Sequence, residues 1–168
     1  MEKNIVFIGM PAAGKSTIGV VVAKRLGYDF VDTDLMIQAQ EKRLLCEIIE
    51  QEGNDRFREI ENQVNRDLDV KRSVISPGGS VVYCEEAMEH FKKTAVIVYL
   101  RIPYHDIMKR LKDIKQRGVS IKEGQTMRDL YDERSVLFEK YADIIVDGRN
   151  GELEKTTEKV LYEVKKYI

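Results

Sequence analysis

Residues 9–17 read GMPAAGKST and match the spacing G-x-x-x-x-G-K-[ST] at every fixed position. Glycines at this spacing let successive backbone N–H groups point into one concavity, which binds phosphate oxygens at a helix N-terminus. The lysine can reach the β- and γ-phosphates of a nucleotide, and the next hydroxyl can bind Mg²⁺. A turn that merely needs glycine would not require all four fixed residues. The predicted nucleotide-contacting residues are Gly9, Ala12, Ala13, Gly14, Lys15, Ser16 and Thr17.

The sequence on either side of this motif supports the same interpretation. Residues 4–9 (NIVFIG) predict a short buried strand, and residues 15–26 predict a helix that ends at Gly27. Strand, loop and helix in this order are the setting that the motif requires. The residues expected on the buried face of the helix are Ile18, Val21, Val22 and Leu26.

Two carboxylates follow the next predicted strand, residues 29–31. Asp32 could hold Mg²⁺ directly or through water, with Ser16 as its partner, and Asp34 could face an acceptor molecule. An acidic residue or threonine before an apolar helical run is also a common N-cap. The sequence leaves metal binding and helix capping as equal alternatives.

Residues 44–68 predict two helices broken at Gly53, and the second carries an apolar stripe made by Phe57, Ile60, Val64 and Leu68. Arg58 lies beside this stripe, and a surface ion pair with Glu61 would explain it. The alternative is a guanidinium group that binds a carboxylate.

Three later segments could also contact ligands. Gly78 and Gly79 directly follow the strand predicted over residues 74–76, which indicates either close approach of the backbone to a ligand or a plain tight turn. Residues 115–124 (KQRGVSIKEG) predict a lid that excludes water, with Arg117 facing phosphate, or a simple surface loop. Arg110 lies either in solvent or over a nucleotide base.

Apolar runs alternate with helical segments, which predicts an α/β fold with a mostly parallel sheet. We expect a three-layer α/β/α sandwich whose five strands bring their ligands to their carboxyl ends. The strands not yet mentioned fall at residues 95–100 and 144–146. A long helix over residues 125–140 and a final helix over residues 151–167 should follow, the last burying Leu153, Val160, Leu161 and Val164.

Length and composition limit the possible functions. A chain of 168 residues suits one domain and buries about two-thirds of its unfolded surface. Its 28 basic and 29 acidic residues nearly balance, which argues against a general nucleic-acid binder. Cys46 and Cys84 have no metal or redox spacing, and no apolar run reaches the length of a membrane span. We therefore expect a cytoplasmic protein without a nucleic-acid or membrane partner.

Taken together, these motifs resemble those of the shikimate kinase family, which is similar to the nucleoside-monophosphate kinases in its P-loop fold. The resemblance covers essentially the whole chain. It is carried by GMPAAGKSTIG, by the DTD at residues 32–34, by FREIE at 57–61, by PGGS and by ERSVLFEKYAD at 133–143. It implies one kinase domain over residues 1–168, with acceptor-binding helices at about 33–70 and a lid at about 113–125.

The resemblance also implies roles for matched residues. Lys15 and Ser16 correspond to phosphate and magnesium ligands, with Asp32 near the magnesium ion. Asp34 corresponds to the carboxylate that contacts the shikimate hydroxyls and assists their deprotonation.

Arg58 and Arg134 correspond to the two arginines that hold the shikimate carboxylate, and Gly78 and Gly79 fall on a glycine motif that binds the acceptor. Arg117 falls near the arginine of the lid. The residues implied near adenine are Arg110 and Arg149.

Three departures from the family pattern concern the acceptor. Ser80 stands where the family has a third glycine, residues 117–120 read Arg-Gly-Val-Ser where the lid has an Arg-Pro-Leu-Leu-like string, and Val-Leu-Phe at 136–138 replaces Pro-Leu-Tyr. We expect a monomeric kinase that uses ATP and Mg²⁺ to phosphorylate shikimate. The alternatives are a kinase for another small hydroxylated acid and a nucleotide-binding protein without transferase activity.

Overall fold

The computed structural model of the protein describes residues 3–111 and 118–168. Within these ranges, five strands form one parallel sheet in the order β2-β3-β1-β4-β5. The strands are β1 (Asn4–Ile8), β2 (Asp29–Asp32), β3 (Ser73–Ser76), β4 (Ala95–Arg101) and β5 (Ile144–Asp147). Each predicted strand is present, so the predicted α/β fold with a five-stranded parallel sheet is confirmed.

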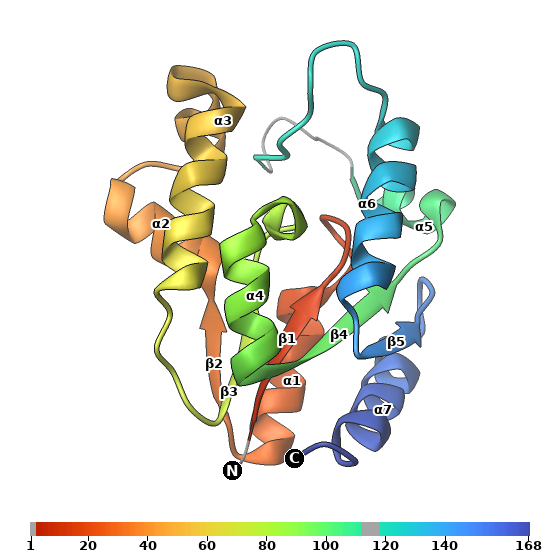
Figure 1. Ribbon diagram of the computed structural model, residues 1–168. Helices are drawn as coiled ribbons and strands as arrows, with labels where there is room; N and C mark the ends of the chain where they lie inside the picture. Colours follow the sequence, from red (N-terminus) through yellow and green to blue (C-terminus); the bar gives the residue numbers. More distant parts are fainter. Residues whose placement is uncertain (1–2, 112–117) are drawn as a thin grey trace.

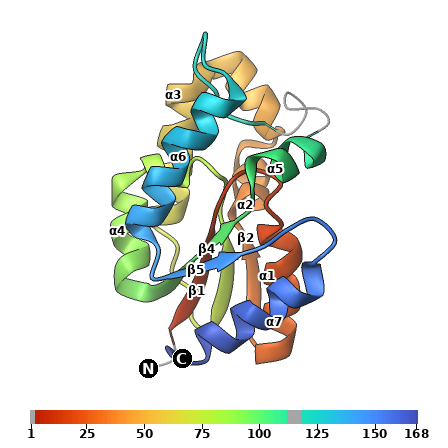
Figure 2. The same ribbon diagram turned by 90° about the vertical axis from the view of Figure 1, so that its right-hand side faces the viewer.

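Helices cover both faces of the sheet, which gives the expected three layers (Figures 1 and 2). Helices α3, α4 and α6 lie on one face, and α1 and α7 lie on the other. The described helices are α1 (Lys15–Leu26), α2 (Thr33–Glu41), α3 (Leu45–Arg66), α4 (Glu85–Thr94), α5 (Tyr104–Arg110), α6 (Met127–Tyr141) and α7 (Leu153–Val164), with a short 3₁₀ helix, η1 (Val81–Tyr83). None of them is both long enough and apolar enough to cross a membrane.

The central strands are buried because both of their faces are covered. All five residues of β1 are buried, and its side chains alternate between two apolar clusters. Val6 and Ile8 pack toward α4 and α6, whereas Ile5 and Phe7 pack toward α1 and α7. A continuous apolar run is therefore the pattern expected of such a strand.

Helix α1 has the predicted bounds but presents a different face to the sheet. Its buried residues are Lys15, Ile18, Gly19, Val22 and Ala23, whereas Val21 is 37 % exposed, so the prediction that Val21 is buried was wrong. Gly19 explains the difference, because a Cβ atom there would lie 2.8 Å from the Phe30 ring. A side chain at this position would therefore collide with β2, so the helix packs there through its glycine. The prediction for Leu153 was also wrong, since it begins α7 and is 47 % exposed.

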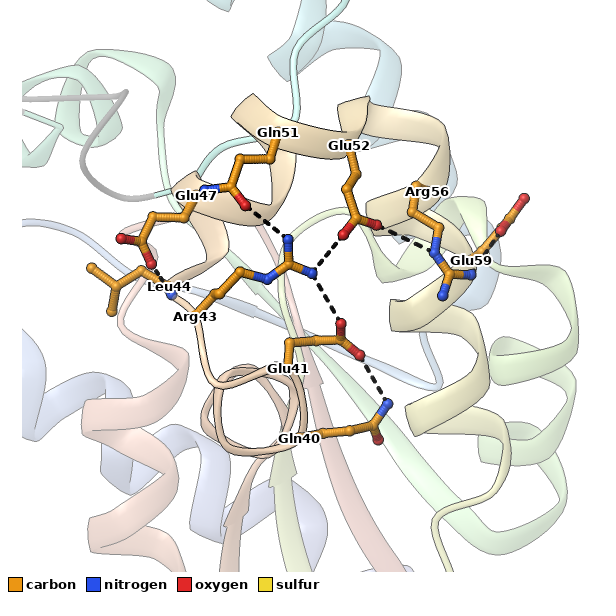
Figure 3. A network of polar contacts seen from close by, with 9 residues as sticks. All are labelled: Gln40, Glu41, Arg43, Leu44, Glu47, Gln51, Glu52, Arg56 and Glu59. Carbon is orange, nitrogen blue, oxygen red and sulfur yellow. Dashed lines mark hydrogen bonds and ion pairs between the residues drawn. The ribbon is translucent and has the colours of Figure 1, made fainter.

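Helix α3 contains the break that the sequence predicted. Gly53 has φ 85° and ψ 170°, which is not a helical conformation. Its positive φ favours glycine over other residues. The first half of α3 is fixed to the end of α2 by Arg43, whose guanidinium group contacts Glu41, Gln51 and Glu52 (Figure 3). The second half carries three residues of the predicted apolar stripe, Phe57, Ile60 and Val64, all buried, whereas Leu68 is buried but lies beyond the end of α3. This corner sets the direction in which α3 crosses the carboxyl end of the sheet.

Helix α6 depends on Phe138 for its position against the sheet. Phe138 is fully buried, and its ring centroid lies 5.0 Å from that of Tyr99 on β4. We expect Phe138→Ala to lower the free energy of unfolding by about 3–5 kcal/mol. Urea denaturation of this variant and of Val136→Ala, whose side chain is 68 % exposed on the same helix, measures the effect. Equal losses in the two variants would contradict this account of the packing.

Candidate active site

The phosphate loop needs glycine at both of its predicted fixed positions. Gly9 has φ 153° and a Cβ atom there would lie 2.9 Å from the Leu100 carbonyl oxygen, while Gly14 has φ 96° and is the N-cap of α1. Lys15 is buried beneath this loop, and its Nζ donates hydrogen bonds of 2.9 Å to the carbonyl oxygens of Gly9 and Met10. Burial lowers the pKa of Lys15 to about 8, although the nearby charge of Asp34 opposes the shift.

A cavity of about 310 Å³ joins the loop to Asp34. Its lining residues are Pro11, Ala12, Gly14, Lys15, Ser16, Thr17, Asp34, Ser76 and Pro77. Three segments that are distant in the sequence therefore meet at the carboxyl ends of β1, β2 and β3. The structure brings five of the seven predicted nucleotide-contacting residues and the predicted acceptor-binding carboxylate to one cavity, whereas Gly9 and Ala13 do not line it.

Asp32 both caps a helix and faces the predicted magnesium position. Its Oδ1 accepts hydrogen bonds from the backbone N–H groups of Asp34 (3.0 Å) and Leu35 (3.3 Å) at the start of α2. Its Oδ2 accepts a hydrogen bond of 3.0 Å from Ser16 Oγ, which also lies 3.1 Å from Ser76 Oγ. The two alternatives left open by the sequence are therefore compatible, because each uses a different carboxylate oxygen.

This oxygen-rich corner fits a magnesium ion that is held mainly by phosphate. Across residues 3–111 and 118–168, no group of three or more His, Cys, Asp or Glu residues could hold a metal ion. Mg²⁺ usually keeps several waters and binds one or two protein groups together with substrate phosphates. Ser16 and Asp32 are suitable ligands of this kind.

Six buried side-chain polar atoms have no hydrogen-bond partner in the described part of the chain. Four of them surround the predicted acceptor position, namely Asp34 Oδ1, Arg58 Nε, Glu61 Oε1 and Arg134 Nε, and the other two are Thr33 Oγ1 and Asn65 Oδ1. Native proteins leave few buried polar groups unpaired, because each such group costs about 1–3 kcal/mol. Four of them in neighbouring residues indicate a surface that is complementary to a polar ligand.

Gly78 lies where two of these acceptor atoms meet. A Cβ atom on Gly78 would lie 2.8 Å from Glu61 Oε1 and 2.9 Å from Asp34 Oδ1. Burial raises the pKa of Asp34 to about 6, and the charge of Asp32 adds to the shift. Burial likewise raises the pKa of Glu61 to about 7, although a 2.5 Å hydrogen bond from Ser80 Oγ to Glu61 Oε2 opposes the shift. The backbone at Gly78 is thus bordered by two carboxyl groups whose pKa values are raised toward neutrality.

The two predicted carboxylate-binding arginines come together from separate helices. Arg58, on α3, and Arg134, on α6, lie 4.5 Å and 5.4 Å from the centroid of the Tyr83 ring. Arg134 also donates a 2.6 Å hydrogen bond from Nη2 to the carbonyl oxygen of Ser120, and burial lowers its pKa. The alternative of a surface ion pair between Arg58 and Glu61 is wrong, since Glu61 is fully buried and no such ion pair occurs among the described residues. Arg58 and Tyr83 also line a second cavity, of about 280 Å³, between α3 and α4.

The remaining predicted residues lie around the phosphate loop. Gly79 packs against the loop itself, because a Cβ atom there would lie 2.8 Å from Pro11 Cδ. Arg110 donates a 3.0 Å hydrogen bond from Nη1 to the Ala12 carbonyl oxygen. Arg149 is exposed in the turn that follows β5. Arg117 and the rest of the predicted lid before residue 118 lie outside the described residues.

Segment 118–126 is described and lies above the carboxyl end of the sheet, between α3 and α6 (Figure 1). Ser120 Oγ donates a 2.9 Å hydrogen bond to Asn54 Oδ1, and Asn54 Nδ2 donates one of 2.9 Å to the Ile121 carbonyl oxygen. A Cβ atom on Gly118 would lie 2.7 Å from Leu45 Cβ. These contacts join the stem of the predicted lid to both halves of α3.

Sequence reasoning assigned no ligand role to two residues that border the arginines. Glu61 had a detectable signal, because it lies four residues after Phe57 and three before Val64 and so falls within the apolar stripe. An acidic residue at a buried helical position indicates a polar site. Tyr83 had no such signal, since it becomes a neighbour of Arg58 and Arg134 only through the tertiary fold.

Comparisons with known proteins agree with this geometry. A family model described as "Shikimate kinase" matches residues 11–165. A shikimate kinase from Thermodesulfovibrio yellowstonii is 38 % identical over 164 residues, which cover 96 % of this chain and 94 % of the relative. The human protein threonine synthase-like 1 is 34 % identical over 169 residues, which cover 99 % of this chain but only 23 % of the relative.

Solved structures give the same result. A shikimate kinase from Acinetobacter baumannii in complex with shikimate superposes with a TM-score of 0.90 at 28 % identity. The match covers 99 % of this chain and 94 % of that chain.

The raised pKa of Glu61 predicts how stability changes with pH. The folded protein holds a proton on Glu61 up to about pH 7, whereas the reference pKa is 4.5, so stability should fall as pH rises through this interval. The loss attributable to Glu61 should be on the order of 3 kcal/mol. Glu61→Gln should remove it, so its free energy of unfolding should decline less than that of the parent between pH 4.5 and pH 8. Urea denaturation measures both, with the exposed Glu59→Gln as the control. Identical pH dependence in the parent and Glu61→Gln would refute the assignment.

Proposed function

Because the chain belongs to the shikimate kinase family, we propose that it transfers the γ-phosphate of ATP to a hydroxyl of shikimate, giving shikimate 3-phosphate and ADP. Besides family membership, one observation on the site of this chain supports the proposal. The cavity at the phosphate loop ends at Asp34, and the unpaired Nε atoms of Arg58 and Arg134 lie beyond it. A nucleotide and a small hydroxylated acid would place their reacting groups on either side of Asp34.

The nucleotide side works by positioning and charge neutralisation, since phosphoryl transfer asks little covalent chemistry of the protein. Backbone N–H groups of residues 12–17 bind the phosphates. Lys15 Nζ donates hydrogen bonds to two carbonyl oxygens of the loop and would contact the transferred phosphate when the nucleotide is bound. Bound Mg²⁺ would neutralise phosphate charge, and Ser16 and Asp32 would hold it. Arg110 and Arg149 would border the adenine.

The acceptor side orients one hydroxyl for attack. Asp34 has a pKa of about 6, raised by burial, so it is mostly ionised at neutral pH and can accept a hydrogen bond from the hydroxyl. Arg58 and Arg134 would bind the carboxylate at the other end of the molecule through charge-assisted hydrogen bonds. Gly78 would allow the acceptor to lie directly against the backbone.

We further propose a single kinase domain over residues 1–168 that acts as a monomer in the cytoplasm. Residues of about 33–70 would form the acceptor-binding helices and residues of about 113–125 the lid. Arg117 would reach the transferred phosphate from that lid.

A related function remains a second candidate: phosphorylation of a different small hydroxylated acid. Ser80 favours it, because its hydroxyl donates a hydrogen bond to Glu61 where a glycine would offer none. A panel of hydroxylated acids tested beside shikimate separates the two. If the protein binds ATP but no tested acceptor leads to its consumption, it would instead be a nucleotide-binding module without transferase activity.

The direct test measures ADP production from ATP and Mg²⁺, with and without shikimate. We expect shikimate to stimulate ADP production strongly in the parent and excess chelator to abolish it. Lys15→Ala should be inactive while retaining the circular dichroism spectrum of the parent, because Lys15 neutralises charge on the transferred phosphate. Shikimate-dependent turnover by Lys15→Ala close to that of the parent would contradict the mechanism. No stimulation of the parent by shikimate would refute the proposed acceptor.

Removing either acceptor arginine should weaken acceptor binding specifically. Arg58→Ala and Arg134→Ala should each cost about 2–5 kcal/mol, because a carboxylate would be left partly unpaired in a desolvated site. This appears as a steep rise in the KM for shikimate with little change in the KM for ATP. Lysine should restore little of the loss, since it lacks a planar fork. Arg56→Ala is the matched control, because Arg56 also lies on α3 but pairs with Glu52 and Glu59 in solvent.

The same prediction can be tested from the side of the acceptor. An analogue of shikimate without its carboxylate should be a poor substrate for the parent enzyme. If the parent used the analogue as well as the acid, the arginines would not bind the carboxylate.

A further inference from the structure

Tyr83 is the contact that the two acceptor arginines share. It ends η1, three residues after the position of Ser80, and its ring centroid lies 4.5 Å from Arg58 Cζ and 5.4 Å from Arg134 Cζ. The two guanidinium groups come from different helices, α3 and α6. The charges of both also act on the buried carboxyl group of Glu61.

Tyr83 is held through both its hydroxyl group and its backbone. Its hydroxyl donates a 2.5 Å hydrogen bond to Glu133 Oε1, and its backbone N–H donates one of 3.0 Å to the Ser80 carbonyl oxygen. The neighbouring Val81 and Val82 are buried in the core that α4 and α6 share with the sheet. Glu133 is itself held by a 3.3 Å hydrogen bond from Gln125. The hydrogen bond to Glu133 thus holds the hydroxyl end of the half-buried ring toward α6.

Two guanidinium groups brought this close repel each other, and the charge of Arg58 contributes to the lowered pKa of Arg134. Neither forms an ion pair among the residues described here. An aromatic face attracts a cation, and the attraction grows when water is excluded. The Tyr83 ring therefore offsets part of the repulsion, and the Tyr83 side chain also hydrogen-bonds that of Arg134, while both Nε atoms stay unpaired.

We propose that Tyr83 is a positioning residue whose ring holds Arg58 and Arg134 together, with both Nε atoms left for one carboxylate of the acceptor. This inference rests on the proposed function, because it takes the two arginines as the acceptor clamp. It adds that the clamp is assembled before the acceptor binds. A preassembled clamp loses less side-chain entropy on binding, so affinity depends on the ring.

A purely structural role for Tyr83 predicts different behaviour. If the residue only fills space beside α6, its loss would lower stability and leave the kinetic constants of the folded protein unchanged. If the hydroxyl bond to Glu133 is its main role, then phenylalanine would be as damaging as leucine. If the ring acts as a π surface for two cations, Tyr83→Phe should keep the function of the parent and Tyr83→Leu should lose it.

The experiment compares Tyr83→Phe with Tyr83→Leu. We expect Tyr83→Leu to raise the KM for shikimate on the order of 10-fold, since two cation–π contacts are lost, while the KM for ATP stays unchanged. Tyr83→Phe should stay within about twofold of the parent, because the ring retains its π face. Tyr83→Met takes the place of the leucine variant if that protein does not fold. The control is Tyr162→Leu, which removes a surface ring that lies 4.4 Å from Lys166 Nζ.

Crystal structures of the parent and of Tyr83→Leu without acceptor provide a second readout, independent of turnover. We expect the two guanidinium groups to lie farther apart in the variant. Unchanged guanidinium positions, or an unchanged KM in Tyr83→Leu, would overturn the role of Tyr83 while the kinase activity stood. If the parent did not use shikimate, the proposed function would fail, and the guanidinium positions would still decide whether Tyr83 holds the arginines.

Discussion

Four of the six polar atoms that residues 3–111 and 118–168 bury without a hydrogen-bond partner lie at the acceptor position, and they are the constraint on which the site depends. Asp34 Oδ1, Arg58 Nε, Glu61 Oε1 and Arg134 Nε lack partners among the described residues, and each costs free energy in that state. The surrounding apolar packing must offset that cost. In return, a ligand that supplies hydroxyl donors and a carboxylate finds its partners already desolvated and oriented. The free energy of unfolding is thus lower than it would be with these atoms paired, but the unpaired atoms can recognise the acceptor.

The sheet makes this arrangement possible because its parallel strands end on one side. The phosphate loop follows β1, Asp32 ends β2, and the turn with Gly78 follows β3. Helices α3 and α6 then cross that edge and bring one arginine each. Neither helix could hold a cation there alone, because an unpaired buried charge requires support from a neighbour. Tyr83 and the Ser120 carbonyl oxygen supply that support from two further segments.

The parts that the sequence predicted are those encoded by local spacing. The phosphate loop and the bounds of α1 follow from the fixed residues of one motif, and the break at Gly53 follows from one residue type. The buried face of α1 was partly wrong, because Gly19 rotates the helix toward Phe30 and exposes Val21. The dual use of Asp32 and the meeting of two arginines at one ring depend on tertiary packing. The spacing of residues within one segment does not encode such contacts. The sequence therefore predicted the candidate residues but not the contacts between them.

The measurement that tests the central claim most directly is a crystal structure of the protein with ADP, Mg²⁺ and shikimate. The account predicts the shikimate carboxylate within hydrogen-bond distance of Arg58 Nε and Arg134 Nε, and a hydroxyl on Asp34 Oδ1 that faces the phosphate loop. Shikimate bound with its carboxylate toward Lys15, or away from both arginines, would contradict it.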